Sequence, residues 1–383
     1  MRLLRVMLIG LLALVAILAL GACAYLQHPK FGAYPEGERL EAIQRSPHFA
    51  DGMLRNLVPT PILVDDKGTL SVLVGNLLHR VENLRPDVPI PVVKTDLKAL
   101  DATQDTVVWL GHSSYFVLFA GKRILIDPVF SRYAAPVSFS TQAFGGTSIY
   151  AAEDMPEIDV LLITHDHWDH LDHATVTALE PKIGRVFAPL GVGAHFEHWG
   201  YAREKIHEAD WFGKMELNDG LSIHVVPTRH YSGRWLTRNK TLWAGFVLES
   251  AQRRILFGSD SGYGPHFAEM ARRFGGFDLV ALDMGQYDAR WPYIHMTPEQ
   301  AAQAAEDLQT KALLPAHVGR FNIAQHAWNE PFERIARASD GKSYRLLTPM
   351  IGEPLRLDDA TPQFVHWWES AKPASTAESG GQP

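Results

Sequence analysis

The chain has 383 residues, of which 46% are hydrophobic and 21% charged. This is a globular composition, and it excludes collagen, coiled coil or long disorder as the main state. Lysine and arginine number 36 against 43 acidic residues, and the net charge of -7 argues against a nucleic-acid partner. The single cysteine excludes an intramolecular disulfide and a CxxC zinc site. Histidine is abundant instead, with 18 in the chain and four of them between residues 165 and 173.

Residues 1–22 have the pattern of a signal peptide or membrane anchor. Arg2 and Arg5 precede an apolar run that carries no charge as far as residue 26, which is long enough to cross a bilayer. The letters LGAC at residues 20–23 resemble the lipobox of bacterial lipoproteins, which implies cleavage before Cys23 and lipidation of its thiol. An uncleaved helical anchor is the alternative. Both predict a membrane-anchored protein of the bacterial cell envelope whose body faces the periplasm.

The rest of the chain divides by pattern. Residues 23–100 are rich in proline, and we expect an extension that wraps around the core. Residues 101–352 alternate apolar runs with turns and helical patterns, which predicts a single catalytic domain. Its predicted strands are residues 106–110, 115–119, 123–126, 159–164, 221–226, 243–249, 254–257 and 277–283. A helix is predicted over 297–308, with Thr297 as its N-cap. Residues 353–383 are expected to form a tail with a disordered end.

The strongest signal is the run THDHWDHLD at residues 164–172, which directly follows a predicted strand. Binding sites tend to form at such strand ends. Alternate residues of an extended turn share a face, so His165 and His167 can converge on one ion. Asp169 and His170, after the chain turns, can reach a second. Imidazole and carboxylate groups suit zinc and similar metals, whereas a solvated surface histidine loop would not require the buried strand.

The HxHxDH pattern at residues 165–170 resembles the metallo-β-lactamase superfamily. The resemblance implies an α/β fold, a four-layer αβ/βα sandwich with two similar halves. KRILID at 122–127 and RRILFGSD at 253–260 echo one another, as two such halves would. Further motifs follow in the implied order, with Asp127 ending a strand, then His230, Asp260 and His317 in later loops. His224 competes with His230 but lies within a predicted strand.

Blocks between about residues 100 and 325 resemble one branch more narrowly, the phospholipase D that hydrolyses N-acylphosphatidylethanolamines. They include LLITHDHWDHLD and GQYDARWPYIHMTPEQAAQ. A sugar-phosphate lactonase branch is a looser match. The resemblance implies two divalent ions, for which we expect Zn²⁺, although the ligand types also admit iron or manganese. The implied ligands are His165, His167 and His230 for the first ion, Asp169, His170 and His317 for the second, and Asp260 as the bridge. Asp127 and His112 are expected behind these ligands.

The expected reaction is hydrolysis of a phosphodiester bond by a hydroxide that bridges the two ions. With the substrate of the branch, the products are phosphatidic acid and an N-acylethanolamine. The candidate catalytic residues are Asp169, Asp260 and His295, the last of which could equally be a buried structural histidine. The candidate substrate contacts are Tyr231, Arg234, Tyr287, Arg290 and Trp291, with Arg320 as a further candidate for phosphate.

Two other functions stay open on the sequence alone. One is a hydrolase of carbonyl bonds, such as a lactonase, that uses the same metal site. The other is a non-catalytic envelope lipoprotein that binds metal structurally. A structural zinc site is closed and mononuclear, so the double ligand set argues against the second of these. No cysteine is available as a ligand, unlike in the antibiotic-hydrolysing β-lactamases that use one.

Overall fold

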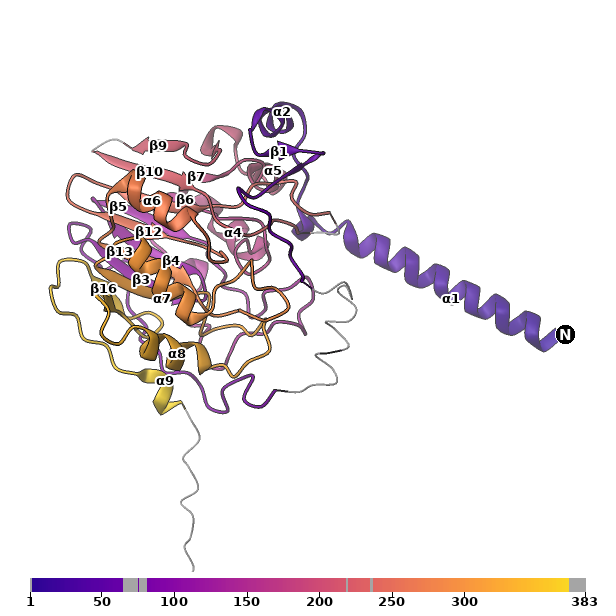
Figure 1. The fold of residues 1–383 in the computed structure, drawn as a ribbon. Coiled ribbons are helices and arrows are strands. Elements are labelled where there is room, and N and C mark those ends of the chain that lie inside the picture. The colour runs from indigo at the N-terminus through magenta and orange to yellow at the C-terminus, as the bar shows by residue number, and fades with distance from the viewer. Residues whose placement is uncertain (1, 65–74, 76–80, 218–219, 235–236, 372–383) are drawn as a thin grey trace, which may run out of the picture.

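The computed structural model describes residues 2–64, 75, 81–217, 220–234 and 237–371 (Figure 1). Two seven-stranded sheets dominate it, and we call them the N-terminal and the C-terminal sheet. The N-terminal sheet has the order β16-β3-β4-β5-β6-β7-β8. Its strands are β3 (Thr106–Gly111), β4 (Ser114–Phe119), β5 (Lys122–Ile126), β6 (Ile158–Leu162), β7 (Ile183–Pro189), β8 (Ile206–Ala209) and β16 (Pro354–Arg356).

The C-terminal sheet has the order β15-β14-β13-β12-β11-β10-β9. Its strands are β9 (Lys214–Leu217), β10 (Leu221–Val226), β11 (Gly245–Glu249), β12 (Arg254–Phe257), β13 (Leu279–Asp283), β14 (Ala312–Ala316) and β15 (Arg345–Leu346). Strands β3 to β5 pair antiparallel in the N-terminal sheet, as β9 to β12 do in the C-terminal sheet, and in both the chain then continues with parallel strands. This shared pattern confirms the two similar halves.

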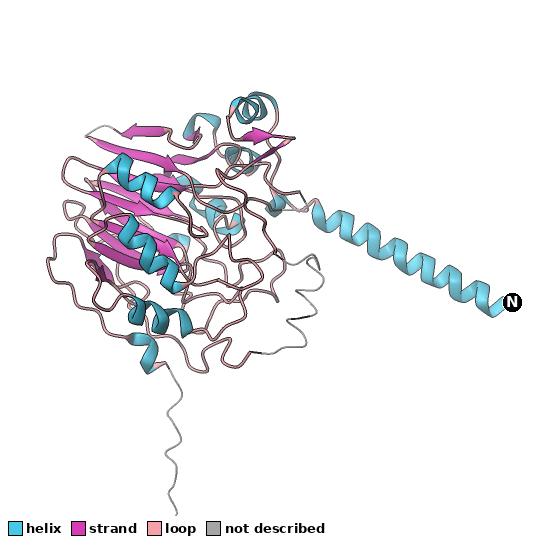
Figure 2. Ribbon diagram, in the orientation of Figure 1, coloured by secondary structure: helices cyan, strands magenta, loops and turns pink. Residues whose placement is uncertain are grey.

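Alternating side chains place the sheets in the middle of the sandwich. Along β3, Val107 and Trp109 belong to the core shared with the C-terminal sheet, whereas Val108 and Leu110 face the other way. That outer face packs against α4 (His173–Leu179) and α5 (Gly193–His198). The outer face of the C-terminal sheet packs against α6 (His266–Phe274), α7 (Pro298–Asp307) and α8 (Glu330–Ala338), as Figure 2 shows. The predicted four-layer αβ/βα sandwich is therefore confirmed.

All eight predicted strands are present, and their bounds shift by at most two residues. The helix predicted from residue 297 is also present. Its N-cap, Thr297, accepts a hydrogen bond from the backbone N–H of Gln300, whose side chain in turn caps Thr297. This is a capping box.

The N-terminal helix projects from the body, whereas the C-terminal elements pack against it (Figure 1). Helix α1 (Arg2–Leu26) projects from the body with no buried residue, and it is followed by α2 (Gly37–Arg45), β1 (Phe49–Ala50) and β2 (Met53–Leu54). At the other end, β16 forms an edge of the N-terminal sheet, and α9 (Trp367–Ser370) buries Trp367 and Trp368. The expected disordered end falls mainly on residues outside those that the structure describes.

The short 3-10 helices are η1 (Pro29–Phe31), η2 (Ala152–Asp154), η3 (Glu180–Lys182) and η4 (Arg203–Lys205).

Candidate metal centre

The candidate ligands gather at one edge of the sandwich, at the carboxyl ends of strands from both sheets. The 165–170 motif follows β6, His230 follows β10, Asp260 follows β12 and His317 follows β14. Four residues here have positive φ although they are not glycine: His112, Asp127, Ser259 and His317. Such conformations cost of order 1–3 kcal/mol each and gather at functional sites, where the surrounding structure holds them.

A first group consists of His165, His167, His230 and Asp260. Nε2 of His165 lies 2.9 Å from Nδ1 of His167, which in turn lies 3.2 Å from Nε2 of His230. The Asp260 carboxylate is 3.8 Å from His165 and 3.6 Å from His230. A tetrahedral ion with ligands at about 2.0–2.1 Å keeps them roughly 3.3 Å apart. The spacing therefore fits one ion.

A second group lies beside it and shares Asp260. Oδ2 of Asp169 is 3.0 Å from Nε2 of His317 and 3.7 Å from Nε2 of His170. Asp260 lies 3.1 Å from His170 and 3.3 Å from His317. Nε2 of His170 and Oδ1 of Asp260 form this 3.1 Å pair, and both atoms are buried without a hydrogen bond to any described residue. Buried polar groups are normally satisfied, so these atoms mark a position where a cation fits.

Protonation supports the same assignment. Burial lowers the pKa of His165 and of His230 well below the usual value, and lowers the pKa of His167 to about 4. These imidazoles are therefore neutral at pH 7, as metal ligands must be. Burial acts in the same direction on His170, but the charges of Asp260 and Asp169 outweigh it and raise the pKa of His170 well above normal. A cation between these residues would replace that proton.

Carboxylates and a carbonyl hold the far sides of the ligand rings. Nδ1 of His170 donates to Asp127 at 2.7 Å, and Asp127 also accepts from the backbone N–H and the hydroxyl of Thr164. Nδ1 of His230 lies 3.0 Å from the carbonyl oxygen of Ile294. Such partners fix the ring orientation and the tautomer of a metal ligand.

Asp283 is a residue that sequence reasoning missed. It ends β13, is fully buried, and lies 2.7 Å from Nδ1 of His295 and 3.3 Å from Nδ1 of His317. It thus supports a ligand and a candidate catalytic residue together. The sequence holds a signal for it, since DLVALD at 278–283 is an apolar run that ends in aspartate, as ILID at 124–127 ends in Asp127.

His112 lies within the second group rather than behind it. Its Nε2 is 3.0 Å from Oδ2 of Asp169, the same distance as that of His317, and its ring is 4.2 Å from the His317 ring. Burial lowers the pKa of His112 to about 4. His224, the competitor of His230, lies in β10 and pairs with Glu249 at 3.0 Å.

His295 and Tyr231 border the centre. The His295 ring stacks on His317 and lies 5.0 Å from both His317 and His230. Tyr231 lies edge-on to His167 at 4.5 Å between ring centroids. Both side chains therefore lie directly against candidate ligands.

The remaining candidate substrate contacts are engaged elsewhere in the protein. Tyr287 donates to Glu330, Trp291 donates to the carbonyl of Gln286, and Arg290 pairs with Asp288. Arg234 is buried and donates to the carbonyl oxygens of Lys30, Asp166 and Leu171. Arg320 is also buried and donates to the carbonyls of Leu110 and Ser131. Both buried arginines thus bind main-chain carbonyls, and two of those bound by Arg234 belong to residues 164–172, the metal loop.

Two further residues, which the sequence does not single out, support the candidate ligands. The side chain of Asn56 donates to the carbonyl of His230 at 2.7 Å and accepts from its N–H at 3.1 Å, so the N-terminal extension pins a candidate ligand. Asp166, inside the motif, accepts from the N–H of Gly233 and the hydroxyl of Thr241. Burial opposes ionisation of Asp166, but His195, the charge of His167 and the N–H of Gly233 lower its pKa to about 2.

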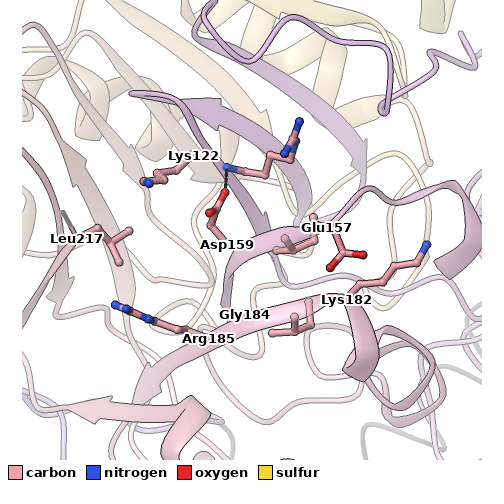
Figure 3. Close-up of a pocket in the computed structure, with 10 residues that line it drawn as sticks. Lys122, Glu157, Asp159, Lys182, Gly184, Arg185 and Leu217 are labelled. Carbon is pink, nitrogen blue, oxygen red and sulfur yellow. Dashed lines mark hydrogen bonds between the residues drawn. The ribbon is translucent and has the colours of Figure 1, made fainter. Parts of the chain in front are cut away.

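A cavity lies at the other end of the strands of the N-terminal sheet, away from the candidate ligands (Figure 3). It has a volume of about 390 Å³ and is lined at the amino ends of β5, β6 and β7 by residues such as Lys122, Asp159 and Arg185. The Asp159 carboxylate accepts there from the N–H of Arg123 at 2.8 Å. None of the predicted site residues lines this cavity.

A two-sheet sandwich with clustered imidazoles and carboxylates at one edge defines a class, the metal-dependent hydrolases of the metallo-β-lactamase fold. A family model described as the beta-lactamase superfamily domain matches residues 122–318. The chain belongs to the metallo-β-lactamase superfamily.

The chain is also similar to curated relatives and, in its fold, to solved structures. An uncharacterized protein of Mycobacterium tuberculosis is 37% identical over 331 residues, covering 85% of this chain and 88% of its own. The N-acyl-phosphatidylethanolamine-hydrolyzing phospholipase D 1 of Caenorhabditis elegans is 28% identical over 248 residues, covering 61% of this chain and 69% of its own. The structure of Igni18, a metallo hydrolase of Ignicoccus hospitalis, shares the fold with a TM-score of 0.52 at 20% identity, covering 66% of this chain and 97% of its own.

Proposed function

We propose that this protein is a dinuclear-metal phosphodiesterase of the cell envelope that cleaves phospholipids of the N-acylphosphatidylethanolamine type. The observation that carries the proposal is the pair of ligand groups that share Asp260. Two ions bound there would lower the pKa of a shared water and neutralise charge on phosphate oxygens. We expect zinc, and we assign the first ion to His165, His167 and His230 and the second to Asp169, His170 and His317.

The protein's own residues complete the proposed reaction. Nδ1 of His295 donates to Asp283, which leaves Nε2 as the nitrogen that exchanges a proton. Beside His230 and His317, this nitrogen can protonate the leaving alkoxide. Tyr231 is proposed to border the substrate, whereas Arg234 supports the metal loop.

The substrate class is supported by the phospholipase D relatives and by the N-terminal helix. Helix α1 is the one described helix long and apolar enough to cross a membrane. We propose that it, or a lipid on Cys23 after cleavage, anchors the protein in the envelope with its body in the periplasm. Anchoring raises the effective concentration of lipid at the site.

The test is an assay of the purified full chain on N-acylphosphatidylethanolamine in mixed micelles, beside a panel of lactones. Release of N-acylethanolamine and phosphatidic acid is the expected result, and Asp260→Asn should abolish it. Asp87→Asn, a change at an exposed aspartate, is the matched control and should leave activity intact. Hydrolysis of lactones alone would replace the phospholipase assignment with a carbonyl-bond hydrolase. Full activity in Asp260→Asn would contradict the bridging assignment.

A further inference from the structure

We propose that the loop of residues 132–143 is a membrane-contacting surface whose tip residue, Phe139, enters the lipid headgroup region beside the end of α1. The inference rests on the membrane anchor of the proposed function and not on the reaction. It names a lipid bilayer as the partner of this loop.

The loop is a short hairpin with a held tip. Backbone hydrogen bonds join Ala134 to Thr141 at 3.0 Å and Ala143 to Arg132 at 2.8 Å. A further bond from the N–H of Ser140 to the carbonyl of Val137, at 3.2 Å, closes the tip. The Phe139 side chain is 81% exposed. Single exposed apolar residues are common, so exposure alone does not indicate a contact surface. The position of Phe139 beside α1 does.

The tip is bonded to the base of α1. The hydroxyl of Tyr25 donates to the carbonyl of Pro136 at 2.5 Å, and Nζ of Lys30 donates to the same oxygen at 2.7 Å. The Tyr25 ring packs edge-on against Phe31 at 5.6 Å, and Phe31 is buried. The contacts of Tyr25, Lys30 and Phe31 therefore fix the end of α1 against the body of the protein.

These contacts place the loop at the level of the membrane surface. The 21 uncharged residues 6–26 span about 31 Å as a helix, close to the roughly 30 Å of a hydrocarbon core. Tyr25 falls at the end of this stretch, where tyrosine is favoured at the interface. Lipidation of Cys23 would put the membrane at the same level, two residues before Tyr25. A loop tip bonded to Tyr25 must then also lie at the interface.

The same geometry orients the metal centre. Phe31 lies edge-on to Trp168 at 5.3 Å, and Trp168 stands between His167 and Asp169 in the metal loop. The metal loop is thus one side chain away from the segment that leaves the bilayer. A lipid surface, and not a soluble protein, is the occupant that the anchor itself brings to this position.

The experiment uses the full chain with Cys23→Ser, which blocks lipidation and keeps α1 as the anchor. A single cysteine is then introduced as F139C and carries an environment-sensitive fluorophore. Its matched control is V365C, at a residue 66% exposed just before α9, which lies far from α1 in Figure 1. Both proteins are reconstituted in vesicles of equal parts phosphatidylethanolamine and phosphatidylglycerol. Quenching by nitroxide-labelled lipid is compared with quenching by aqueous iodide.

We expect the label at 139 to be quenched several-fold more by the nitroxide lipid than the label at 365, and to be shielded from iodide. Equal iodide quenching at both positions, on vesicles that carry the protein in a flotation assay, would overturn the loop assignment alone. Failure of both proteins to float with vesicles would overturn the anchor as well. S138C at the same tip should give the result of F139C, and a folded S138C protein with full iodide quenching would equally contradict the proposal.

Discussion

The carboxylate of Asp127 accepts a hydrogen bond from Nδ1 of His170 at 2.7 Å. This bond keeps the proton on Nδ1 and turns Nε2 toward Asp260, 3.1 Å away. The other half of the molecule repeats the arrangement, since Asp283 at the end of β13 lies 3.3 Å from Nδ1 of His317. Each sheet therefore supplies a carboxylate that orients one of the two histidines assigned to the proposed second ion.

Replacing Asp127 with asparagine should weaken the second ion selectively. Loss of a carboxylate behind a ligand histidine typically lowers metal affinity by about 10–100-fold. Titration against a competing chelator measures the two affinities separately. Asp87→Asn serves again as the control. Unchanged affinity for both ions in Asp127→Asn would show that Asp127 does not position His170.

Asn56→Ala should destabilise the protein at the backbone of His230, a residue assigned to the first ion. The change leaves the N–H and carbonyl of a buried segment without partners, at a cost of about 2–3 kcal/mol in the free energy of unfolding. Asn56→Asp keeps the acceptor but sets a carboxylate oxygen against the carbonyl oxygen of His230, so it should destabilise the protein as well. Denaturant unfolding of both variants measures the loss, and equal stability of Asn56→Ala and the unaltered chain would refute it.

Arg234→Met separates a structural from a substrate-binding role. The guanidinium donates to three carbonyl oxygens and lies 4.0 Å from the Trp168 ring centroid. Its loss should reduce the free energy of unfolding by about 2–4 kcal/mol.

Arg290→Met is the comparison, because Arg290 is partly exposed and pairs with Asp288. Exposed ion pairs contribute about 0–1 kcal/mol. If Arg234→Met instead kept its stability and only raised KM, Arg234 would be a substrate contact as the sequence predicts.

Removal of metal should destabilise the protein as well as inactivate it. Ions that bind only the folded state stabilise it by about 4 kcal/mol when their concentration is a thousand times the Kd. We expect a chelator to lower Tm and added Zn²⁺ to restore it. An identical Tm in both conditions would indicate that the imidazole and carboxylate cluster holds no ion.

The sequence predicts eight strands of the two large sheets well, because they are short apolar runs bounded by turns. It misses the other six strands of these sheets, among them β14, where Pro315 normally argues against a strand. The structure explains the exception. The neighbouring strand β15 pairs only with Ala312 and Leu313, so no hydrogen-bond donor is needed at Pro315 on that side.

The site is predictable where residue type alone limits the choice, as for His165 and Asp260. It is less predictable where distant segments meet. Asn56 reaches His230 across 174 residues, and nothing in its local pattern marks it. Arginines are ambiguous for a related reason, since the guanidinium groups of Arg234 and Arg320 bind main-chain carbonyls inside the protein as readily as they would bind phosphate.

The central claim is that one edge of the sandwich binds two ions that share Asp260. An anomalous-difference map from crystals of the full chain grown with Zn²⁺ tests it most directly. We predict two peaks about 3.5–4 Å apart, one beside His165 and His230 and the other beside His170 and His317. A single peak, or two peaks that do not both lie next to Asp260, would contradict the account.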